Sequence, residues 1–251
     1  MFFDRGIKFL FQTLRVVKGI CSNVKYRVEQ KYIITEDKMT YLKFKLENIM
    51  MYDKHAKEGE YRIRSLYFDD MYNSYLEDNE SGNDFREKYR IRTYNNDTDK
   101  IHLEIKAKER GYTSKVKEEL TVQECMNYIS GCVPVLGSAD GFVKKKLYAL
   151  QLLRKMHPVQ IVEYDRIPFV EEKGNVRVTF DKNIVGTSEI GAFFESCLPG
   201  IPLLPTGQHI LEVKYDEFLP DYIKKILNEV HLQKTAFSKY YYARKNQLIY
   251  R

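Results

Sequence analysis

Three glutamates of this chain each stand two residues before a lysine, and that spacing places both side chains on one face of a β-strand. The three pairs are Glu29 and Lys31, Glu104 and Lys106, and Glu212 and Lys214. Carboxylate oxygens are the ligands that hard divalent cations take, and a lysine ammonium neutralises a nearby phosphate oxygen. One such pair is common by chance, but three on predicted strands indicate a site that holds a metal ion together with phosphate.

Lysine and arginine also recur at every second position within the predicted strands. The basic sets are Arg86, Lys88, Arg90 and Arg92; Lys106 and Lys108; and Lys115 and Lys117. Like charges that face each other across a sheet destabilise it, so such rows are costly unless an anion lies between them. Two interpretations stay open on the residues alone: each basic face points to water, or the faces turn inward around a polyanion.

The elements that carry these residues follow two periodicities. A period of two predicts strands at 26–32, 60–69, 85–94, 100–108, 112–120, 159–167, 175–182 and 209–216. A period of 3.6 predicts helices at 36–51, 122–130, 139–156, 219–230 and 236–248. Tight turns such as 109–111 join successive strands, which favours an antiparallel sheet. The segment 189–207, rich in proline and glycine, is predicted to be a loop.

Composition limits the class of protein. The 251 residues are 43% hydrophobic and 14% aromatic, which is enough for a buried core and too much for a disordered chain. No apolar run approaches the roughly 18 residues that cross a membrane. The four cysteines form no CxxC pair, so we expect reduced thiols rather than a disulfide scaffold or a zinc ribbon. The net charge of +6 indicates only a mild preference for anionic partners.

Residues 1–23 have a pattern of their own. Their apolar residues recur at helical spacing, and four basic residues stand against one aspartate, which predicts a basic amphipathic helix. Such a helix either packs on its own domain or contacts a membrane surface or a membrane-protein partner. We therefore divide the chain into this helix and a domain at 24–251, and we expect a cytoplasmic location, with membrane association as the second option.

Eight segments of the chain match one family in order. They are YRVEQKYII (26–34), YRIRSLYFDD (61–70), EKYRIRTY (87–94), HLEIKAKERGYTSKVKEEL (102–120), VEYDRIPF (162–169), VRVTFDKNI (176–184), ILEVKYDE (210–217) and AFSKYYY (236–242). Through them, nearly all of 24–245 resembles the VTC domain, the polyphosphate polymerase domain of the vacuolar transporter chaperone family. The resemblance implies the fold of the CYTH or triphosphate tunnel metalloenzymes. That fold is α+β, with a closed antiparallel β-tunnel, helices packed outside and a basic lumen that bears glutamates.

The resemblance also implies roles for individual residues. Catalytic contacts to phosphate are expected from Lys31, Arg90, Arg92, Lys106 and Lys239. Substrate contacts are expected from Arg166 and Arg177, from Lys115 or Lys117, and from further basic residues of the same faces, Arg27, Lys88, Lys108 and Lys214. The expected metal is Mn²⁺ or Mg²⁺, with Glu212 as its ligand and Glu29 and Glu104 as further carboxylates in the lumen.

One residue departs from the family's pattern, and another is out of phase with its predicted strand. The pattern has a lysine just before Phe-Ser-Lys, but this chain has Ala236 there, and Lys234 stands two residues earlier. Arg166 is out of phase with Glu163 and Asp165 along its predicted strand. We therefore expect a β-bulge in this strand, because one extra residue would turn both sets inward.

The implied activity is transfer of the γ-phosphate of ATP to pyrophosphate or to a growing polyphosphate chain. Two alternatives use the same tunnel: hydrolysis of tripolyphosphate or nucleoside triphosphates, and binding of polyphosphate without turnover. We expect no nucleic-acid partner, because the tyrosines fall mostly on the apolar phase of strands or in helices, where they offer no stacking surface. No covalent nucleophile is expected, since phosphoryl transfer needs mainly positioning and charge neutralisation.

Overall fold

The computed structural model describes residues 27–249 except 57, 110–111 and 134. The amphipathic helix predicted at 1–23 and part of the turn predicted at 109–111 lie outside the described residues. The chain forms two compact units. The first unit contains Leu66–Arg92 and Thr98–Val159, and the second unit contains Tyr26–Ser65, Thr93–Asp97 and Gln160–Arg251.

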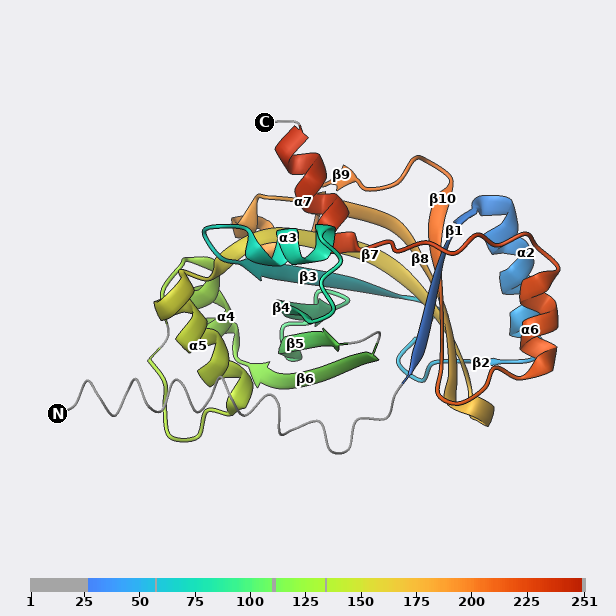
Figure 1. The fold of residues 1–251 in the computed structure, drawn as a ribbon, viewed down its shortest axis with the longest axis horizontal. Coiled ribbons are helices and arrows are strands. Elements are labelled where there is room, and N and C mark those ends of the chain that lie inside the picture. The colour runs from blue at the N-terminus through green and yellow to red at the C-terminus, as the bar shows by residue number, and fades with distance from the viewer. Residues whose placement is uncertain (1–26, 57, 110–111, 134, 250–251) are drawn as a thin grey trace. The chain divides into compact units, whose positions relative to one another are not determined.

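The strands are hydrogen-bonded in the order β1-β10-β8-β7-β3-β4-β5-β6 (Figure 1). The pairs β1–β10, β10–β8, β8–β7, β4–β5 and β5–β6 are antiparallel. Their bounds are β1 Val28–Thr35, β3 Tyr61–Asp69, β4 Arg86–Tyr94, β5 Ile101–Glu109, β6 Tyr112–Leu120, β7 His157–Glu171, β8 Val176–Thr187 and β10 Gln208–Tyr215. The short strands β2 Met51–Tyr52 and β9 Ile201–Pro202 pair with β7 and β8. The predicted α+β class with a large antiparallel sheet is confirmed.

The prediction that the sheet closes into a tunnel is wrong for the part of the chain that the structure describes. The strand order is an open path, with β1 at one end and β6 at the other. The outer edge of β1 is already engaged, because Tyr32 forms a bridge with Lys234 and the Thr235 backbone N–H donates to the Lys31 carbonyl at 2.9 Å. A strand edge covered by a loop in this way is protected from further pairing.

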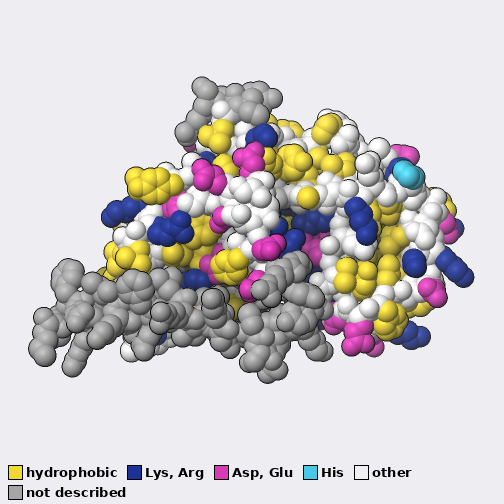
Figure 2. Space-filling view, in the orientation of Figure 1, with side chains coloured by type: hydrophobic (Ala, Val, Ile, Leu, Met, Phe, Trp, Pro, Cys, Tyr) yellow, Lys and Arg dark blue, Asp and Glu magenta, His cyan; other side chains and the backbone are white. Residues whose placement is uncertain are grey.

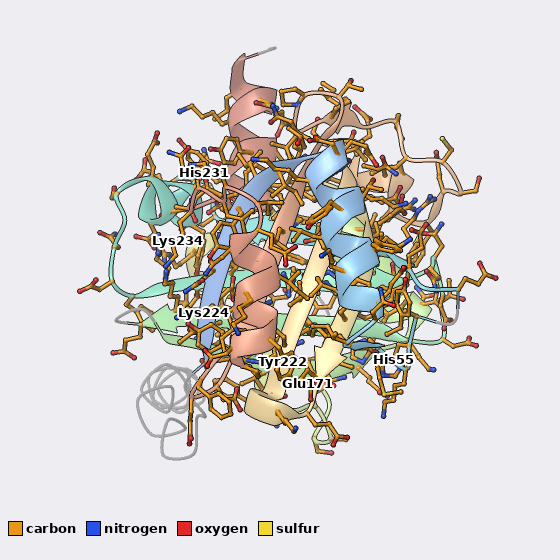
Figure 3. The ribbon with its side chains drawn as sticks, turned by 90° about the vertical axis from the view of Figure 1, so that its right-hand side faces the viewer. His55, Glu171, Tyr222, Lys224, His231 and Lys234 are labelled. Atoms are coloured by element: carbon orange, nitrogen blue, oxygen red, sulfur yellow. The ribbon has the colours of Figure 1, made fainter. Side chains whose placement is uncertain are left out.

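In the second unit, two helices cover one face of the sheet. Helices α2 (Glu36–Glu47) and α6 (Asp221–Asn228) lie side by side against β1, β10 and β8 (Figure 3). The buried core between the helices and the sheet contains Leu42, Leu46, Phe180, Leu211 and Ile223. Burial of each such side chain contributes about 1.5–3 kcal/mol. The opposite face of these strands therefore carries the alternate residues, which are mostly charged.

Helix α2 forms where the sequence predicts it but ends earlier, at Glu47. Met39, Leu42 and Leu46 recur at helical spacing and are buried. Glu36 in the first turn and Lys45 in the last turn complement the helix dipole. The helix positions β1 directly, since β1 runs into it at Thr35 without a loop.

In the first unit, helix α5 (Phe142–Arg154) packs against β5 and β6, and helix α4 (Val122–Ile129) follows β6 in the chain. Tyr89, Leu103 and Leu147 are completely buried. Helix α4 starts with a capping box between Thr121 and Glu124. The remaining helices of the described residues are α3 Ser74–Glu80, α7 Lys239–Ile249 and the 3₁₀ turns η3 Lys173–Asn175 and η4 Ile190–Phe194.

Helix α3 was not predicted, because seven residues are too few to show an apolar period. Its start is fixed instead by the two preceding carboxylates. The backbone N–H of Tyr75 donates to Asp69 at 3.0 Å, and that of Ser74 donates to Asp70 at 3.0 Å. Both aspartates are buried, so these bonds satisfy groups that water does not reach. The loop predicted at 189–207 contains η4 and β9.

Within the described residues, none of the helices combines the length and the apolar character needed to pass through a lipid bilayer. Figure 2 shows lysine and arginine side chains interspersed with aspartate and glutamate side chains over the visible face. The surplus of basic residues is therefore not gathered on that surface.

Candidate functional site

The polar face of β1, β10, β8 and β7 in the second unit carries alternating charges, and we call it the Lys31 face. Its residues are Glu29, Lys31, Arg166, Arg177, Thr179, Asp181, Glu212 and Lys214. The antiparallel register sets Lys31 opposite Glu212 and Glu29 opposite Lys214. Two E-x-K motifs on neighbouring antiparallel strands therefore form a square in which every cation has a carboxylate beside it.

The square is closely packed. Lys31 Nζ lies 3.2 Å from Glu29 and 3.6 Å from Glu212, and Lys214 Nζ lies 2.8 Å from Glu212 and 3.8 Å from Glu29. Burial disfavours the charged Glu212, but Lys214, Lys31 and Arg166 outweigh it and hold the pKa of this carboxyl well below its ordinary value. Burial would lower the pKa of Lys31, but Glu212 and Glu29 raise it. Glu212 and Lys31 are therefore both ionised at neutral pH.

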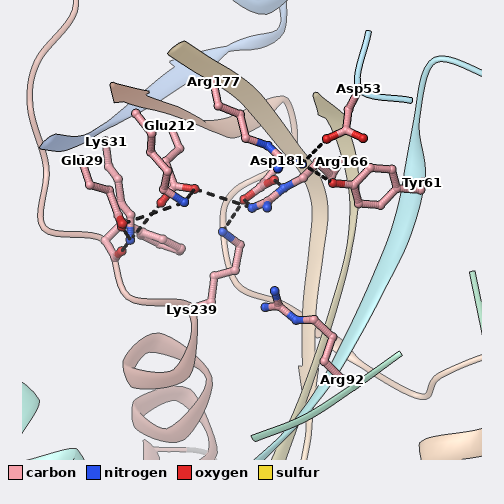
Figure 4. Close-up of polar contacts among 12 residues, drawn as sticks. Glu29, Lys31, Asp53, Tyr61, Arg92, Arg166, Arg177, Asp181, Glu212 and Lys239 are labelled. Atoms are coloured by element: carbon pink, nitrogen blue, oxygen red, sulfur yellow. Dashed lines mark hydrogen bonds and ion pairs between the residues drawn. The ribbon is translucent and has the colours of Figure 1, made fainter. Parts of the chain in front are cut away.

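A third carboxylate, Asp181 of β8, links strand β7 to helix α7. Asp181 is completely buried and accepts from Arg166 at 2.6 and 2.8 Å and from Lys239 at 2.6 Å (Figure 4). Burial raises the pKa of the Asp181 carboxyl, but the positive charges of Arg166 and Lys239 outweigh it and lower the pKa to about 2. Arg166 also lies 3.7 Å from Glu212, so Asp181 and the square form one network.

The expected bulge is present in β7. The register with β8 shifts between Glu163 and Asp165. After the shift Arg166 pairs directly with Asp181, while Ile167 faces the core. The bulge therefore turns Arg166 onto the same face as Glu212, as one extra residue in a strand does.

Two further basic residues predicted for the site, Arg177 and Arg27, are held by partners outside the square. Arg177 lies 2.9 Å from Asp53 and donates to the Tyr61 hydroxyl at 2.8 Å. Arg27 Nε lies 3.3 Å from Asp216, and its guanidinium also donates to the Asn175 carbonyl. Both guanidiniums are thereby held by groups from distant segments of the chain.

The polar face of β4, β5 and β6 in the first unit is mostly basic, and we call it the Arg90 face. Eight basic residues share it with two carboxylates and one histidine: Arg86, Lys88, Arg90, Arg92, Lys106, Lys108, Lys115, Lys117, Glu104, Glu119 and His102. The register sets Lys88 opposite Lys106 and Lys106 opposite Lys115. Three lysines thus stand in one row across three strands.

Glu104 is the carboxylate that orders this face. It is 1% exposed and lies 2.7 Å from Arg90, 3.1 Å from Lys115 and 4.0 Å from Arg92. Burial raises the pKa of Glu104, but these three cations outweigh it and lower the pKa far below its ordinary value. Glu104 therefore stays ionised and fixes Arg90 in place.

One family model, the VTC domain, matches residues 26–246. The chain belongs to the VTC-domain family. A search of curated proteins found no match to this VTC domain.

Several solved structures resemble this VTC domain in fold. A Pyrococcus horikoshii OT3 protein, PH1819, is 18% identical with a TM-score of 0.46, over 90% of this chain and 100% of that one. A putative adenylate cyclase from Bacillus halodurans is 12% identical with a TM-score of 0.45, over 82% and 87%. The Mimivirus capping enzyme triphosphatase is 12% identical with a TM-score of 0.39, over 87% and 92%.

The site residues predicted from the sequence fall into two groups in this VTC domain. The second unit brings together Arg27, Glu29, Lys31, Arg166, Arg177, Glu212, Lys214 and Lys239. The Arg90 face brings together Lys88, Arg90, Arg92, Glu104, Lys106, Lys108, Lys115 and Lys117. Lys115 and Lys117 both lie on the Arg90 face, because residues two apart on a strand share a face. Lys115 contacts Glu104, and Lys117 Nζ lies 3.1 Å from His102.

Several partners of the predicted residues were missed, among them Asp181, Asp53 and Tyr61. Asp181 lies two residues beyond Thr179 in the alternation of β8, so its face could be read from the sequence, but its role as the anchor of Arg166 and Lys239 could not. Asp53 and Tyr61 hold Arg177, yet they come from a loop and from another strand. A contact between distant segments leaves no local signal in the sequence.

The Lys31 face could supply a divalent metal with only part of its ligands. Glu29 and Glu212 converge on the same two lysines, which makes them the best-placed pair of carboxylates. Among the described residues, no three aspartate, glutamate, histidine or cysteine side chains form a group able to hold a metal alone. Two carboxylates therefore fit a metal that takes its remaining oxygens from phosphate and water, as Mg²⁺ usually does.

Proposed function

We propose that this VTC domain is a metal-dependent polyphosphate polymerase that transfers the γ-phosphate of ATP to pyrophosphate or to a growing polyphosphate chain. The observation that carries the proposal is the Lys31 face. There, four cations contact the carboxylates Glu29, Asp181 and Glu212: Lys31, Arg166 and Lys214 of the face itself, and Lys239 of helix α7. Membership of the VTC-domain family supports the same chemistry.

The cations would act by positioning and by neutralising charge. Lys31, Arg166 and Lys239 would bind the oxygens of the triphosphate and compensate the negative charge on the transferred phosphoryl group. A terminal oxygen of the acceptor forms the new P–O bond to the γ-phosphorus, and the bond between that phosphorus and the β–γ bridging oxygen breaks. ADP leaves with the electron pair, so no protein nucleophile is needed.

Glu29 and Glu212 are the carboxylates that we propose for the metal, which would be Mn²⁺ or Mg²⁺. The metal would supply positive charge to the phosphate oxygens. In the structure these carboxylates hold Lys31 and Lys214. We infer an exchange in which the carboxylates turn to the metal and the lysines turn to phosphate. Glu104 lies 2.7 Å from Arg90, and we give it the role of positioning that guanidinium.

The Arg90 face suits a long anionic product. Phosphate chains carry one negative charge or more per unit, and the row of Lys88, Lys106 and Lys115 offers cations in succession. Retention of the chain between additions would favour elongation over release. This feature supports the polymerase over simple hydrolysis of a triphosphate.

The test incubates the purified full chain with ATP and Mn²⁺ and separates the products on a gel stained for polyphosphate. Chains that lengthen with time support the proposal. Orthophosphate as the sole product overturns it in favour of a hydrolase. Tight polyphosphate binding with no turnover overturns it in favour of a binding module.

We propose a cytoplasmic location, where ATP is plentiful and thiols stay reduced, and no nucleic-acid partner. Contact with a membrane or a membrane protein through residues 1–23 stays a prediction. It is tested by sedimentation with vesicles of anionic lipid, comparing the full chain with a chain from which residues 1–23 are deleted. Equal sedimentation of the two proteins would contradict it.

A further inference from the structure

Two buried polar groups on β8 have no hydrogen-bond partner among the described residues. They are the Thr179 hydroxyl and Arg177 Nε. Thr179 is 1% exposed, so bulk solvent does not reach its hydroxyl. The two residues stand two positions apart, with Val178 between them in the core, so both belong to the Lys31 face.

The neighbours of Thr179 explain why its hydroxyl is unpaired. The register sets it opposite Glu212 on one side and Pro168 on the other. Glu212 is already engaged by Lys214, Lys31 and Arg166. Pro168 has no polar side chain. The hydroxyl thus lies beside a network of charged side chains that are paired with one another, and none of them is its partner.

An unpaired buried hydroxyl costs free energy of folding, and valine of nearly the same shape would remove that cost. A threonine at this position therefore weakens the folded protein unless something else binds its hydroxyl. The same reasoning applies to Arg177 Nε, because Asp53 and Tyr61 are both contacted by the terminal nitrogen of that guanidinium.

We propose that the Thr179 hydroxyl and Arg177 Nε donate to one phosphate group of the bound triphosphate or polyphosphate. The inference rests on the proposed function and adds to it a neutral ligand. Residues two apart on a strand are separated by about 7 Å, a gap that one phosphate with a hydrogen bond on each side can span. Because Thr179 is covered, the phosphate reaches it only after the side chains above it, such as Glu212, exchange partners.

The test compares Thr179→Val, Thr179→Ser and Thr187→Val for thermal unfolding and for tripolyphosphate binding by calorimetry, with and without Mn²⁺. Thr187 is the matched control, because it is a buried threonine of the same strand whose hydroxyl already accepts the Glu189 N–H at 3.1 Å. Thr179→Val should keep or raise Tm and weaken binding about tenfold or more, since a hydrogen bond to a charged group is lost. Thr179→Ser should bind like the wild type. Thr187→Val should lower Tm and leave affinity unchanged.

The outcomes separate this inference from the proposed function. If the wild type does not bind tripolyphosphate, both are overturned. If it binds and Thr179→Val binds equally well, the inference alone is overturned. A Thr179→Val variant with lower Tm would show that the hydroxyl serves the fold, which also overturns the inference. Should Thr179→Val fail to fold, Thr179→Ala against Thr179→Ser measures the same hydroxyl, and equal affinities would overturn the inference.

Discussion

The Lys31 face and the Arg90 face share the E-x-K motif but differ in charge balance: the first is nearly balanced, and the second is strongly basic. On β1 and β10 two E-x-K motifs run antiparallel, so each lysine meets a glutamate of the other strand. On β5 the motif has no such partner. Its neighbours β4 and β6 present basic residues at the facing positions, so Lys106 lies between Lys88 and Lys115.

The difference teaches that a motif's function depends on its neighbour in the sheet. The Lys31 face is stabilised by its own ion pairs and can exchange them for metal and phosphate. The Arg90 face carries like charges side by side, which cost stability until an anion binds. Removal of a lysine charge is therefore expected to lower the stability of the protein on the Lys31 face and to raise it on the Arg90 face.

The largest expected effect is on stability, from Asp181→Asn. The substitution leaves Arg166 and Lys239 without their buried counter-charge, and loss of one partner of a buried ion pair costs about 3–5 kcal/mol. Chemical denaturation measures the free energy of unfolding. If the loss stays below 1 kcal/mol, Asp181 does not anchor this network.

Asp165→Asn is the matched control on β7. Asp165 pairs with Arg62, whose side chain is 44% exposed. An exposed pair contributes about 0–1 kcal/mol, so this variant should differ little from the wild type. A comparable loss in both variants would mean that burial does not separate them.

The second prediction concerns metal dependence. Glu212→Gln keeps the shape of the side chain but removes the charge that we assign to the metal, so the Mn²⁺-activated rate should fall about a hundredfold. Glu104→Gln on the Arg90 face should keep its activation by Mn²⁺, because we assign Glu104 to positioning Arg90 and not to the metal. The measurement is the initial rate of ATP consumption over a Mn²⁺ titration. If only Glu104→Gln lost its activation by Mn²⁺, the metal would have to be assigned to the Arg90 face instead of the Lys31 face.

The third prediction is a pH dependence. The pKa of Asp181 falls from 3.8 to about 2 on folding, so its ionised form stabilises the protein above about pH 4. That stability is lost as pH falls through the folded pKa, and on the order of 2 kcal/mol should disappear between about pH 4 and pH 2. Asp181→Asn should lack this part of the slope. Parallel curves for the two proteins would argue against a lowered pKa.

Much of this arrangement could be predicted from the sequence, because period-two and period-3.6 patterns are local. Strands β4, β5 and β6 lie within a residue or two of their predicted bounds. The face of each charged residue follows from the same alternation. The bulge at Asp165 could be predicted too, since Arg166 is out of phase with its neighbours.

What could not be predicted depends on which strands are neighbours. Without the pairing of β1 with β10, the square of Glu29, Lys31, Glu212 and Lys214 is invisible. The open order of the sheet was missed for the same reason, because the segment that covers β1 at Tyr32 is a loop with no period. Asp53, which holds Arg177, is likewise distant in sequence.

The smallest expected effects decide whether the two faces really differ. Lys31→Gln removes the cation that Glu29 and Glu212 share, so the free energy of unfolding should fall by about 1–3 kcal/mol. Lys106→Gln removes the middle charge of a lysine row, so stability should rise by a few tenths to about 1 kcal/mol. Both variants should bind tripolyphosphate more weakly. If the free energy of unfolding changes in opposite directions while both affinities for tripolyphosphate fall, the Lys31 face is stabilised by its own ion pairs and the Arg90 face by a bound anion. A loss of stability in both variants would instead show that Lys106 also stabilises the fold.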